Sequence, residues 1–491
     1  MKVLLVYPEF PDTYWSFRHA LRFERKRSPF PPLGLLTLAS MLPGEWEKRL
    51  VDLNAERLSR SDVEWADIVF ASAMLVQKKS LDEVVARCQA MGKRVVVGGP
   101  YVSTTNESQS ADHIFKGEVE TTLPVFLKDL ELGIAEKVYK SETKPDLTLT
   151  PVPDFSLARL NAYSAMSVQY SRGCPFQCEF CDIIEIYGRV PRTKTNDQII
   201  NELEALYTAG WRGTVFIVDD NFIGNKRSVK KMLPDLAQWS KEHQHPFSFL
   251  TEASVNLAED DELLGMMRES NFRRVFLGIE TPVEASLKEA HKNQNTRGSL
   301  LDSVKKIQSY GMEVMAGFIV GFDNDPEDIF ERQIQFIRES AIPLAMVGLL
   351  NALPDTGLWR RLEKEGRLLK ESSGNNTDCS LNFIPRMDPT RLIEGYKEIL
   401  RTIYRPDEYY RRALECLSRI SDVAPEQPFL LSGGIPSFVR LVTRLGIIDR
   451  ERAEFWRFVR SVYRDHRESF AKAMTLAAMG YHFRKLTERY S

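Results

Sequence analysis

Short apolar runs alternate with helix-like segments over the first 140 residues. The runs are rich in β-branched residues and lie at 3–7, 67–71, 94–97 and 113–115, and the helix-like segments lie at 33–42 and 80–91. Strands that alternate with helices are typical of a parallel sheet covered by helices on both faces. The pattern predicts a doubly wound α/β domain over residues 1–140.

The alternation stops at residues 141–160 and then resumes. Residues 141–154 are rich in Pro, Thr and Lys and show no periodicity, which predicts a linker over 141–160. In the region 161–356, strands are expected at 166–171, 214–218, 248–252, 274–279, 313–320 and 344–350, and helices at 196–209, 229–242, 260–268, 297–310 and 326–339. Six strands separated by five helices predict a partial (β/α)6 barrel, whose chemistry lies at the carboxyl ends of its strands.

The strand pattern fades after residue 356, so the remaining chain predicts a helical domain over 357–491. Helices are expected at 389–404, 407–418, 450–466 and 469–487. Residues 431–491 contain 12 Lys or Arg and 6 Asp or Glu, a net charge of +6. Basic and apolar residues interleave there, namely Arg452, Arg457, Arg460 and Arg464 with Phe455, Trp456, Phe458 and Val462. The pattern predicts either an apolar helix side that belongs to the core, or a peripheral contact with an anionic membrane surface.

Composition and charge narrow the class of protein. The 491 residues are 43% apolar and 27% charged, which excludes a disordered or fibrous chain. Because 66 Lys and Arg nearly cancel 68 Asp and Glu, no overall charge attracts the chain to nucleic acid, and we expect no nucleic-acid partner. The chain has no run of about 18 apolar residues, and the run at 3–7 is too short for a secretory signal. We therefore expect a cytoplasmic protein.

Three of the six cysteines fall within eight residues, directly after the first strand of the predicted barrel. Cys174, Cys178 and Cys181 have the spacing C-x3-C-x2-C. A structural zinc site usually has four protein ligands, and no fourth Cys or His lies on this loop, so zinc is disfavoured. Three thiolates can instead hold a [4Fe–4S] cluster and leave one iron open to another ligand. In an electron carrier the protein normally supplies a ligand to every iron of the cluster, which three cysteines do not do. An iron–sulfur electron carrier or redox sensor nevertheless stays open as an alternative.

Other polar or glycine residues also follow predicted strands. Asp219 and Asp220, Glu252, and Glu280 follow the second, third and fourth strands of the barrel. In the first domain, Gly98-Gly99-Pro100 and Gly117-Glu118 follow two of the strands, at the edge where such sheets bind ligands. The alternatives are that Asp219, Asp220 and Glu280 cap the helices that follow them, and that Gly98-Gly99-Pro100 is only a tight turn.

The cysteine loop, with Phe180 before its last cysteine, resembles the signature of the radical S-adenosylmethionine enzymes. The resemblance implies that the open iron binds S-adenosylmethionine and that an electron from an external donor cleaves it. The 5′-deoxyadenosyl radical so formed takes hydrogen from an unactivated carbon. It also implies that Asp219 or Asp220 accepts the methionine ammonium group. Glu252 and Glu280 are expected to make further cofactor contacts, Glu280 being the stronger candidate.

The first domain is similar to that of the cobalamin-binding class of these enzymes. The shared blocks are 31–36 (PPLGLL), Ser72-Ala73-Met74, Gly98-Gly99-Pro100 and Gly117-Glu118-Val119-Glu120. This resemblance implies that cobalamin is bound near Ser72, Gly98, Gly99, Gly117 and Glu118. The motif D-x-H-x-x-G, which supplies a histidine to cobalt in other cobalamin proteins, is absent from the domain, so the resemblance implies binding without that lower ligand. A domain that binds no cofactor is the alternative.

Across residues 1–420 the chain resembles the hopanoid C-2 methylases and their relatives, including the stretches 181–194 and 211–226. The resemblance implies methyl transfer to a carbon of a lipid or isoprenoid. One S-adenosylmethionine would methylate the cobalamin, and a second would supply the radical. Sister enzymes form rings or C–C bonds, so a cobalamin-free enzyme that oxidises, cyclises or couples its substrate is the second hypothesis.

Overall fold

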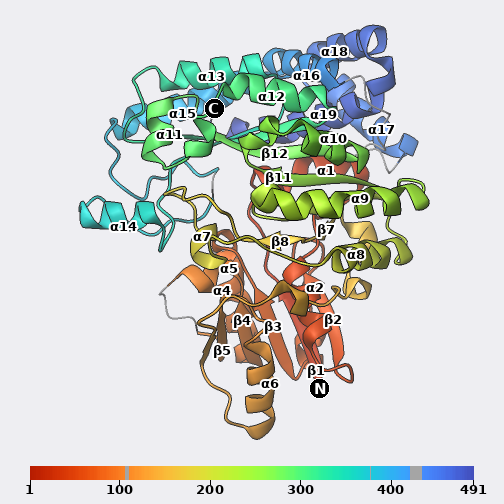
Figure 1. The fold of residues 1–491 in the computed structure, drawn as a ribbon, viewed down its shortest axis with the longest axis vertical. Coiled ribbons are helices and arrows are strands. Elements are labelled where there is room, and N and C mark those ends of the chain that lie inside the picture. The colour runs from red at the N-terminus through yellow and green to blue at the C-terminus, as the bar shows by residue number, and fades with distance from the viewer. Residues whose placement is uncertain (106–109, 376, 421–433, 491) are drawn as a thin grey trace.

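The computed structural model describes residues 1–105, 110–375, 377–420 and 434–490 (Figure 1). Its first sheet has six parallel strands in the order β2-β1-β3-β4-β5-β6. The strands are β1 (Lys2–Tyr7), β2 (Glu47–Asp52), β3 (Ile68–Ser72), β4 (Arg94–Gly98), β5 (His113–Lys116) and β6 (Val138–Lys140). The helices between them are α2 (Leu33–Met41), α3 (Arg60–Trp65), α4 (Lys78–Ala90), α5 (Pro100–Thr104) and α6 (Leu123–Leu132). Buried aliphatic clusters lie on both faces of the sheet, which confirms the doubly wound prediction.

The second sheet is also parallel, with the order β14-β13-β12-β11-β10-β7. Its strands are β7 (Met166–Val168), β10 (Gly213–Ile217), β11 (Phe247–Ala253), β12 (Phe272–Glu280), β13 (Glu313–Val320) and β14 (Ala345–Leu349). The helices are α8 (Asn196–Thr208), α9 (Lys226–Glu242), α10 (Asp261–Glu269), α11 (Glu284–Glu289), α12 (Leu300–Ser309) and α13 (Ile329–Ser340). The prediction of six strands separated by helices is confirmed, with two short helices, α7 (Ile183–Ile186) and α11, in addition.

The first expected strand of this sheet, 166–171, is interrupted. After β7 the chain forms β8 (Ser171–Arg172), which pairs antiparallel with β9 (Arg192–Thr193) in a separate two-stranded ribbon. The cysteine loop and the short helix α7 (Ile183–Ile186) connect the two strands of this ribbon. The ribbon therefore closes the base of the loop that carries the three cysteines.

Residues 13–24 lie between the second sheet and the C-terminal helices, an arrangement that the sequence pattern did not predict. This segment contains a 3-10 turn (Tyr14–Ser16) and α1 (Arg18–Glu24). The ring of Trp15 stacks on Phe216 of β10, and Tyr14 Oη donates a hydrogen bond to the carbonyl of Val347, 2.9 Å away. The start of the chain is thus part of the core around the second sheet.

The C-terminal region is helical, as predicted. It contains α14 (Gly357–Lys364), α15 (Pro389–Ile403), α16 (Pro406–Ile420), α17 (Gly434–Val442), a π-helical turn (Thr443–Ile448), α18 (Arg452–Asp465) and α19 (Phe470–Thr487). Phe455, Phe458 and Val462 are fully buried, and Phe458 stacks on Tyr410 of α16. The apolar side of α18 is therefore core, and the alternative that these three side chains contact a membrane is wrong. Among the described residues, no helix is both long enough and apolar enough to cross a bilayer.

Candidate functional site

The three clustered cysteines share a small, partly buried region at the carboxyl ends of the barrel strands. Burial comes first among the causes that raise the pKa of Cys174 and of Cys181, and the neighbouring cysteines raise each pKa further. Asn221 Nδ2 lies 3.7 Å from Cys174 Sγ, and Gln294 Nε2 lies 3.6 Å from Cys178 Sγ. Amide N–H groups aimed at sulfur favour the thiolate form, as a metal–sulfur cluster requires. Among the described residues, no three His, Cys, Asp or Glu side chains are placed to hold a single metal ion.

Ion pairs and backbone bonds fix the shape of the cysteine loop. Gly173 has a φ of 96°, and a Cβ there would stand 2.9 Å from the carbonyl oxygen of Gly188, so only glycine fits this close approach. Glu179, between the second and third cysteines, forms a bidentate pair with Arg361 of α14, with N–O distances of 2.7 and 3.0 Å. The first helix after the barrel therefore holds the loop, a contact that no sequence motif indicated.

Asp219 and Asp220 are adjacent but have different surroundings. The buried Asp219 carboxylate accepts hydrogen bonds from Tyr170 N at 2.7 Å, Ser171 N at 2.8 Å and Ser171 Oγ at 2.6 Å. All three come from the residues that lead into the cysteine loop, so Asp219 serves to anchor this segment. Asp220 is less buried, and one of its oxygens accepts from Gly173 N at 2.9 Å. Neither caps the next long helix, whose N-cap is Asn225, so that alternative is wrong.

The charge of Asp220 acts on the carboxyl group of Glu252. Burial, followed by the charge of Asp220, raises the pKa of Glu252 to about 8. Burial is also the main cause that raises the pKa of Asp220 to about 7. Two carboxyl groups at the ends of neighbouring strands β10 and β11 resist ionisation until a cation lies between or beside them. Such a pair is suited to accept an ammonium group.

Glu280 has an ion-pair partner within the protein. Its carboxylate binds the ammonium group of Lys292, and both side chains are buried. The Lys292 ammonium lies 5.8 Å from the centre of the Phe180 ring and interacts with the charges of Cys178 and Cys181. Helix α11 begins after Val283, so the prediction that Glu280 could cap this helix is wrong. Glu280 instead positions Lys292 beside the cysteines.

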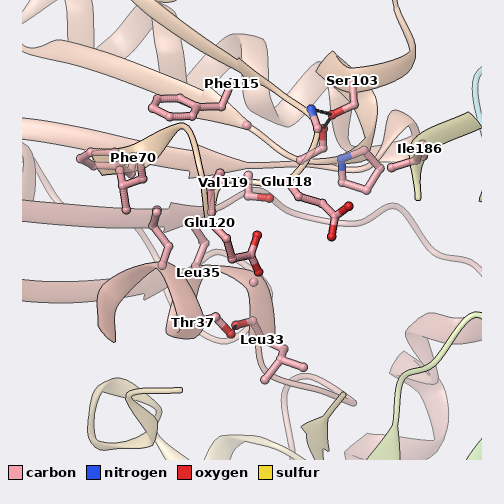
Figure 2. Close-up of a pocket in the computed structure, with 18 of the residues that line it drawn as sticks. Leu33, Leu35, Thr37, Phe70, Ser103, Phe115, Glu118, Val119, Glu120 and Ile186 are labelled. Atoms are coloured by element: carbon pink, nitrogen blue, oxygen red, sulfur yellow. Dashed lines mark hydrogen bonds between the residues drawn. The ribbon is translucent and has the colours of Figure 1, made fainter. Parts of the chain in front are cut away.

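A partly open cavity of about 240 Å³ lies where the first sheet meets the base of the cysteine loop (Figure 2). Ser72, Gly98, Gly99, Gly117 and Glu118, which the sequence proposed for cofactor binding, all line it. Residues after the ends of β7 and β10, the ribbon, and α7 with its C-cap contribute Gln169, Val218, Arg172, Ile186 and Tyr187. The structure thus brings these candidates from β3, β4 and β5 together and places them next to the segment that leads to Cys174.

Two glycines of this cavity have a positive φ, but they differ in the space that a side chain would find. Gly99 has a φ of 96°, and a Cβ there would stand 2.6 Å from Ser72 Oγ. Gly99 thus forms a tight turn, as the alternative for Gly98-Gly99-Pro100 supposed, and it also lines the cavity. Gly117 has a φ of 88°, its N–H donates to Ser103 Oγ at 2.9 Å, and a Cβ there would meet nothing within 4 Å. The sequence did not single out Ser103, because a lone serine carries no recognisable spacing.

A group of four charges, two buried glutamates and two partly buried arginines, joins the cavity to the cysteine loop. Arg172 Nη1 lies 2.8 Å from a Glu118 oxygen and 2.7 Å from a Glu120 oxygen, and Arg192 Nη2 lies 2.8 Å from Glu118. Glu120 Oε2 is buried without a hydrogen-bond partner. The Glu118 carboxylate is therefore committed to two arginines, and Arg172 connects the cavity firmly to the segment that leads into the cysteine loop. None of the described residues that line the cavity is a histidine. His113 bonds the carbonyl of Glu136, at the other end of β5.

The known proteins that this chain resembles are radical S-adenosylmethionine proteins and methyltransferases. A family model described as the radical SAM superfamily matches residues 168–337, and a domain of unknown function (DUF4070) matches residues 356–491. The chain is 44% identical to an uncharacterized methyltransferase of Synechocystis sp., over 99% of this chain and 92% of the relative. It is 35% identical to the hopanoid C-2 methylase of Rhodopseudomonas palustris, over 97% of this chain and 92% of the relative. The cobalamin-dependent S-adenosylmethionine radical enzyme OxsB shares its fold, with a TM-score of 0.61 at 16% identity, over 100% of this chain and 80% of that one.

Proposed function

The chain belongs to the cobalamin-dependent methyltransferases of the radical S-adenosylmethionine superfamily, and we propose that its substrate is a lipid or isoprenoid of the hopanoid type, methylated at an unactivated carbon. The 35% identity to a hopanoid C-2 methylase over nearly the whole of both chains supports this substrate class. The observation that carries the methyl-transfer assignment is the cavity at the edge of the first sheet, which is joined by Arg172 to the cysteine loop and would hold the methyl-donating cofactor beside it.

The cysteine loop fits a [4Fe–4S] cluster. Cys174, Cys178 and Cys181 would hold it, and the amide groups of Asn221 and Gln294 donate toward two of the sulfurs. The Lys292 ammonium adds a positive charge on the same side. These donors offset the negative charge of a cluster held by three thiolates.

The cavity fits part of a cobalamin. Its lining combines apolar groups, such as Leu35 and Phe115, with the hydroxyls of Ser72 and Ser103, as Figure 2 shows for several of them. The unpartnered Glu120 Oε2 is an acceptor suited to an amide N–H, and cobalamin carries amide arms around its ring. Because the cavity is partly open, a ligand larger than its 240 Å³ can project from it.

The proposed roles of the chain's own residues follow from these positions. When bound, the cluster supplies the electron that cleaves S-adenosylmethionine, and the cobalamin supplies the methyl group. Asp220 and Glu252 bind the methionine ammonium group of S-adenosylmethionine, which removes the mutual repulsion of the two carboxylates. Asp219 keeps the leading segment of the cysteine loop in place, and Arg172 fixes that segment relative to the cavity. No acid–base residue is required, because the hydrogen removed from an unactivated carbon has no useful acidity.

The test is anaerobic reconstitution of the whole chain with iron, sulfide and hydroxocobalamin, followed by reaction with S-adenosylmethionine, a reductant and a hopanoid lipid. We expect bound cobalamin, formation of 5′-deoxyadenosine and a lipid that has gained one methyl group. Formation of 5′-deoxyadenosine together with an oxidised or cyclised lipid would contradict methyl transfer, and methylation of only a water-soluble substrate would contradict the lipid assignment.

A further inference from the structure

Exposed apolar side chains gather at one end of the C-terminal helices. Ile447 and Ile448, in the π-helical turn, are 63% and 58% exposed, and Val439 of α17 is 53% exposed. Of the sixteen exposed large apolar side chains among the described residues, six lie between residues 435 and 463. Trp456 of α18, 38% exposed, donates from Nε1 to the carbonyl of Gly446 at 2.9 Å and so lies beside Ile447. Exposed apolar residues that form one patch mark an interaction surface.

The local structure holds this patch outward. Leu441 and Leu445 turn to the core, while Val439 and Ile447 take positions on the opposite side of the same helical segment. Asp449 ends the π-helical turn, where it forms an ion pair with the Arg484 guanidinium, and its N–H bonds the carbonyl of Arg444 at 2.9 Å. Asp449, which directly follows Ile448, thus anchors the end of the turn and leaves Ile447 and Ile448 exposed.

A basic cavity of about 570 Å³ adjoins the apolar patch. Its charged lining residues are Arg401, Arg405, Arg444, Arg450, Arg484 and Lys485, against Asp449, Glu451 and Glu488, which is a net charge of +3. Ile448 lines the same cavity. The cavity also contains Pro406, the first residue of α16, but Asp407 and Glu408 already occupy the first turn of this helix, so the charge of the cavity comes from its side chains. Cations therefore border the exposed side chain of Ile448 directly.

We propose that this surface, Val439, Ile447, Ile448 and Trp456 with the basic cavity, docks on an anionic lipid bilayer and takes the phosphate of an anionic phospholipid into the cavity. Apolar side chains enter the boundary between headgroups and acyl chains, a tryptophan is favoured at that depth, and nearby arginines attract anionic lipid. The net positive charge of the cavity complements the negative charge of a phosphate. A neutral protein partner carries no such charge. The proposal rests on the proposed function only in that a lipid substrate resides in a bilayer.

The experiment is co-sedimentation of the reconstituted full chain with vesicles of phosphatidylcholine alone or of phosphatidylcholine with phosphatidylglycerol, at low and at physiological salt. We expect binding that requires phosphatidylglycerol and weakens with salt. Ile447→Ser with Ile448→Ser, and separately Arg450→Glu with Lys485→Glu, should each weaken binding by about tenfold or more. The matched controls lie in the first domain: Leu132→Ser with Ile134→Ser, whose side chains are 61% and 63% exposed, and Arg57→Glu with Lys128→Glu. These controls should bind as the parent does.

Three outcomes of the vesicle experiment would overturn the proposal. They are absence of binding to anionic vesicles at low salt, an equal loss in the control variants, and displacement of the protein from vesicles by soluble glycerol phosphate as effectively as by lipid. A concentration-dependent dimer that buries Trp456 would assign the surface to a second copy instead. Formation of 5′-deoxyadenosine, measured without vesicles in every variant, reports folding and radical chemistry separately. Loss of vesicle binding with retained 5′-deoxyadenosine thus concerns only this surface.

Discussion

Two adjacent aspartates show how far a residue's role depends on its surroundings. The sequence pattern located Asp219 and Asp220 at the end of a strand, but it did not indicate which of the two binds the cofactor. In the structure Asp219 is occupied by three hydrogen bonds from Tyr170 and Ser171, and Asp220 is the group coupled to Glu252. The distinction depends on which way each side chain points from the strand end, and residue spacing does not encode that direction.

Replacing Asp219 by alanine should destabilise the protein. Three buried donors would lose their acceptor, and we expect the free energy of unfolding to fall by about 3 kcal/mol or more. Urea unfolding of the protein without cofactors measures this change. The exposed Glu363→Ala, in α14, should change it by less than about 0.5 kcal/mol. Equal effects of the two variants would show that the Asp219 hydrogen bonds contribute little.

Replacing Glu252 by glutamine should flatten the dependence of stability on pH. The pKa of Glu252 is raised in the folded chain to about 8, whereas an unfolded glutamate titrates near about 4.3. The folded state then holds the proton that the unfolded state loses, so the parent's stability should fall as pH rises between about 5 and about 8. Urea unfolding at both pH values, without S-adenosylmethionine, compares parent and variant. Parallel pH profiles would contradict the raised pKa.

Replacing Cys174, Cys178 or Cys181 by alanine should abolish both the cluster absorbance and the formation of 5′-deoxyadenosine. Each remaining pair of thiolates cannot hold the cluster. Cys379→Ala is the control variant and should keep the cluster. Cys88 and Cys416 are less suitable as controls, because they are fully buried and their replacement would leave small cavities. Metal analysis and visible spectra of the anaerobic protein give the readout, and a Cys178→Ala variant with the parent's iron content would refute the ligand assignment.

At the scale of elements, the sequence predicted most strands and long helices because their apolar periodicity is strong. It missed β2, whose residues Glu47–Asp52 include four charged side chains on an edge strand, and the three-residue β6. It also extended the first barrel strand through Ser171, because hydrophobicity alone does not reveal that Asp219 captures the backbone of that segment. Ion pairs between distant elements, such as Glu179 with Arg361, leave no local pattern at all.

The contact between the first sheet and the cysteine loop should depend on Glu118 and Glu120. Changing both to glutamine would leave the largely buried Arg172 without a counter-charge, and we expect a loss of about 3 kcal/mol in the free energy of unfolding. Glu64→Gln removes an exposed pair with Arg60 and should cost about 0.5 kcal/mol or less. Denaturant unfolding of both variants makes the comparison, and a small effect of the double variant would mean that water replaces the carboxylates around Arg172.

At the scale of the whole molecule, the C-terminal helices are part of the core around the second sheet. Phe483 of α19 stacks on Tyr14 and on Tyr404, and His482 Nε2 lies 3.2 Å from the carbonyl oxygens of Thr13 and Tyr14. Burial comes first among the causes that lower the pKa of His482 to about 3, so it stays neutral at ordinary pH. A chain that ends at Ile420 would expose these rings, and we expect it to aggregate or to lose cooperative thermal unfolding. A soluble, cooperatively folding truncation would show that the C-terminal helices are independent.

The central claim is that this fold brings two cofactors together for methyl transfer to a lipid. The most direct measurement uses S-adenosylmethionine with a deuterium-labelled methyl group, the anaerobically reconstituted chain and a hopanoid lipid, with mass spectrometry of the lipid and of the nucleoside products. The predicted result is one labelled methyl group per lipid product, with 5′-deoxyadenosine and S-adenosylhomocysteine formed in equal amounts. Release of 5′-deoxyadenosine without S-adenosylhomocysteine, and with no labelled lipid, would contradict the account.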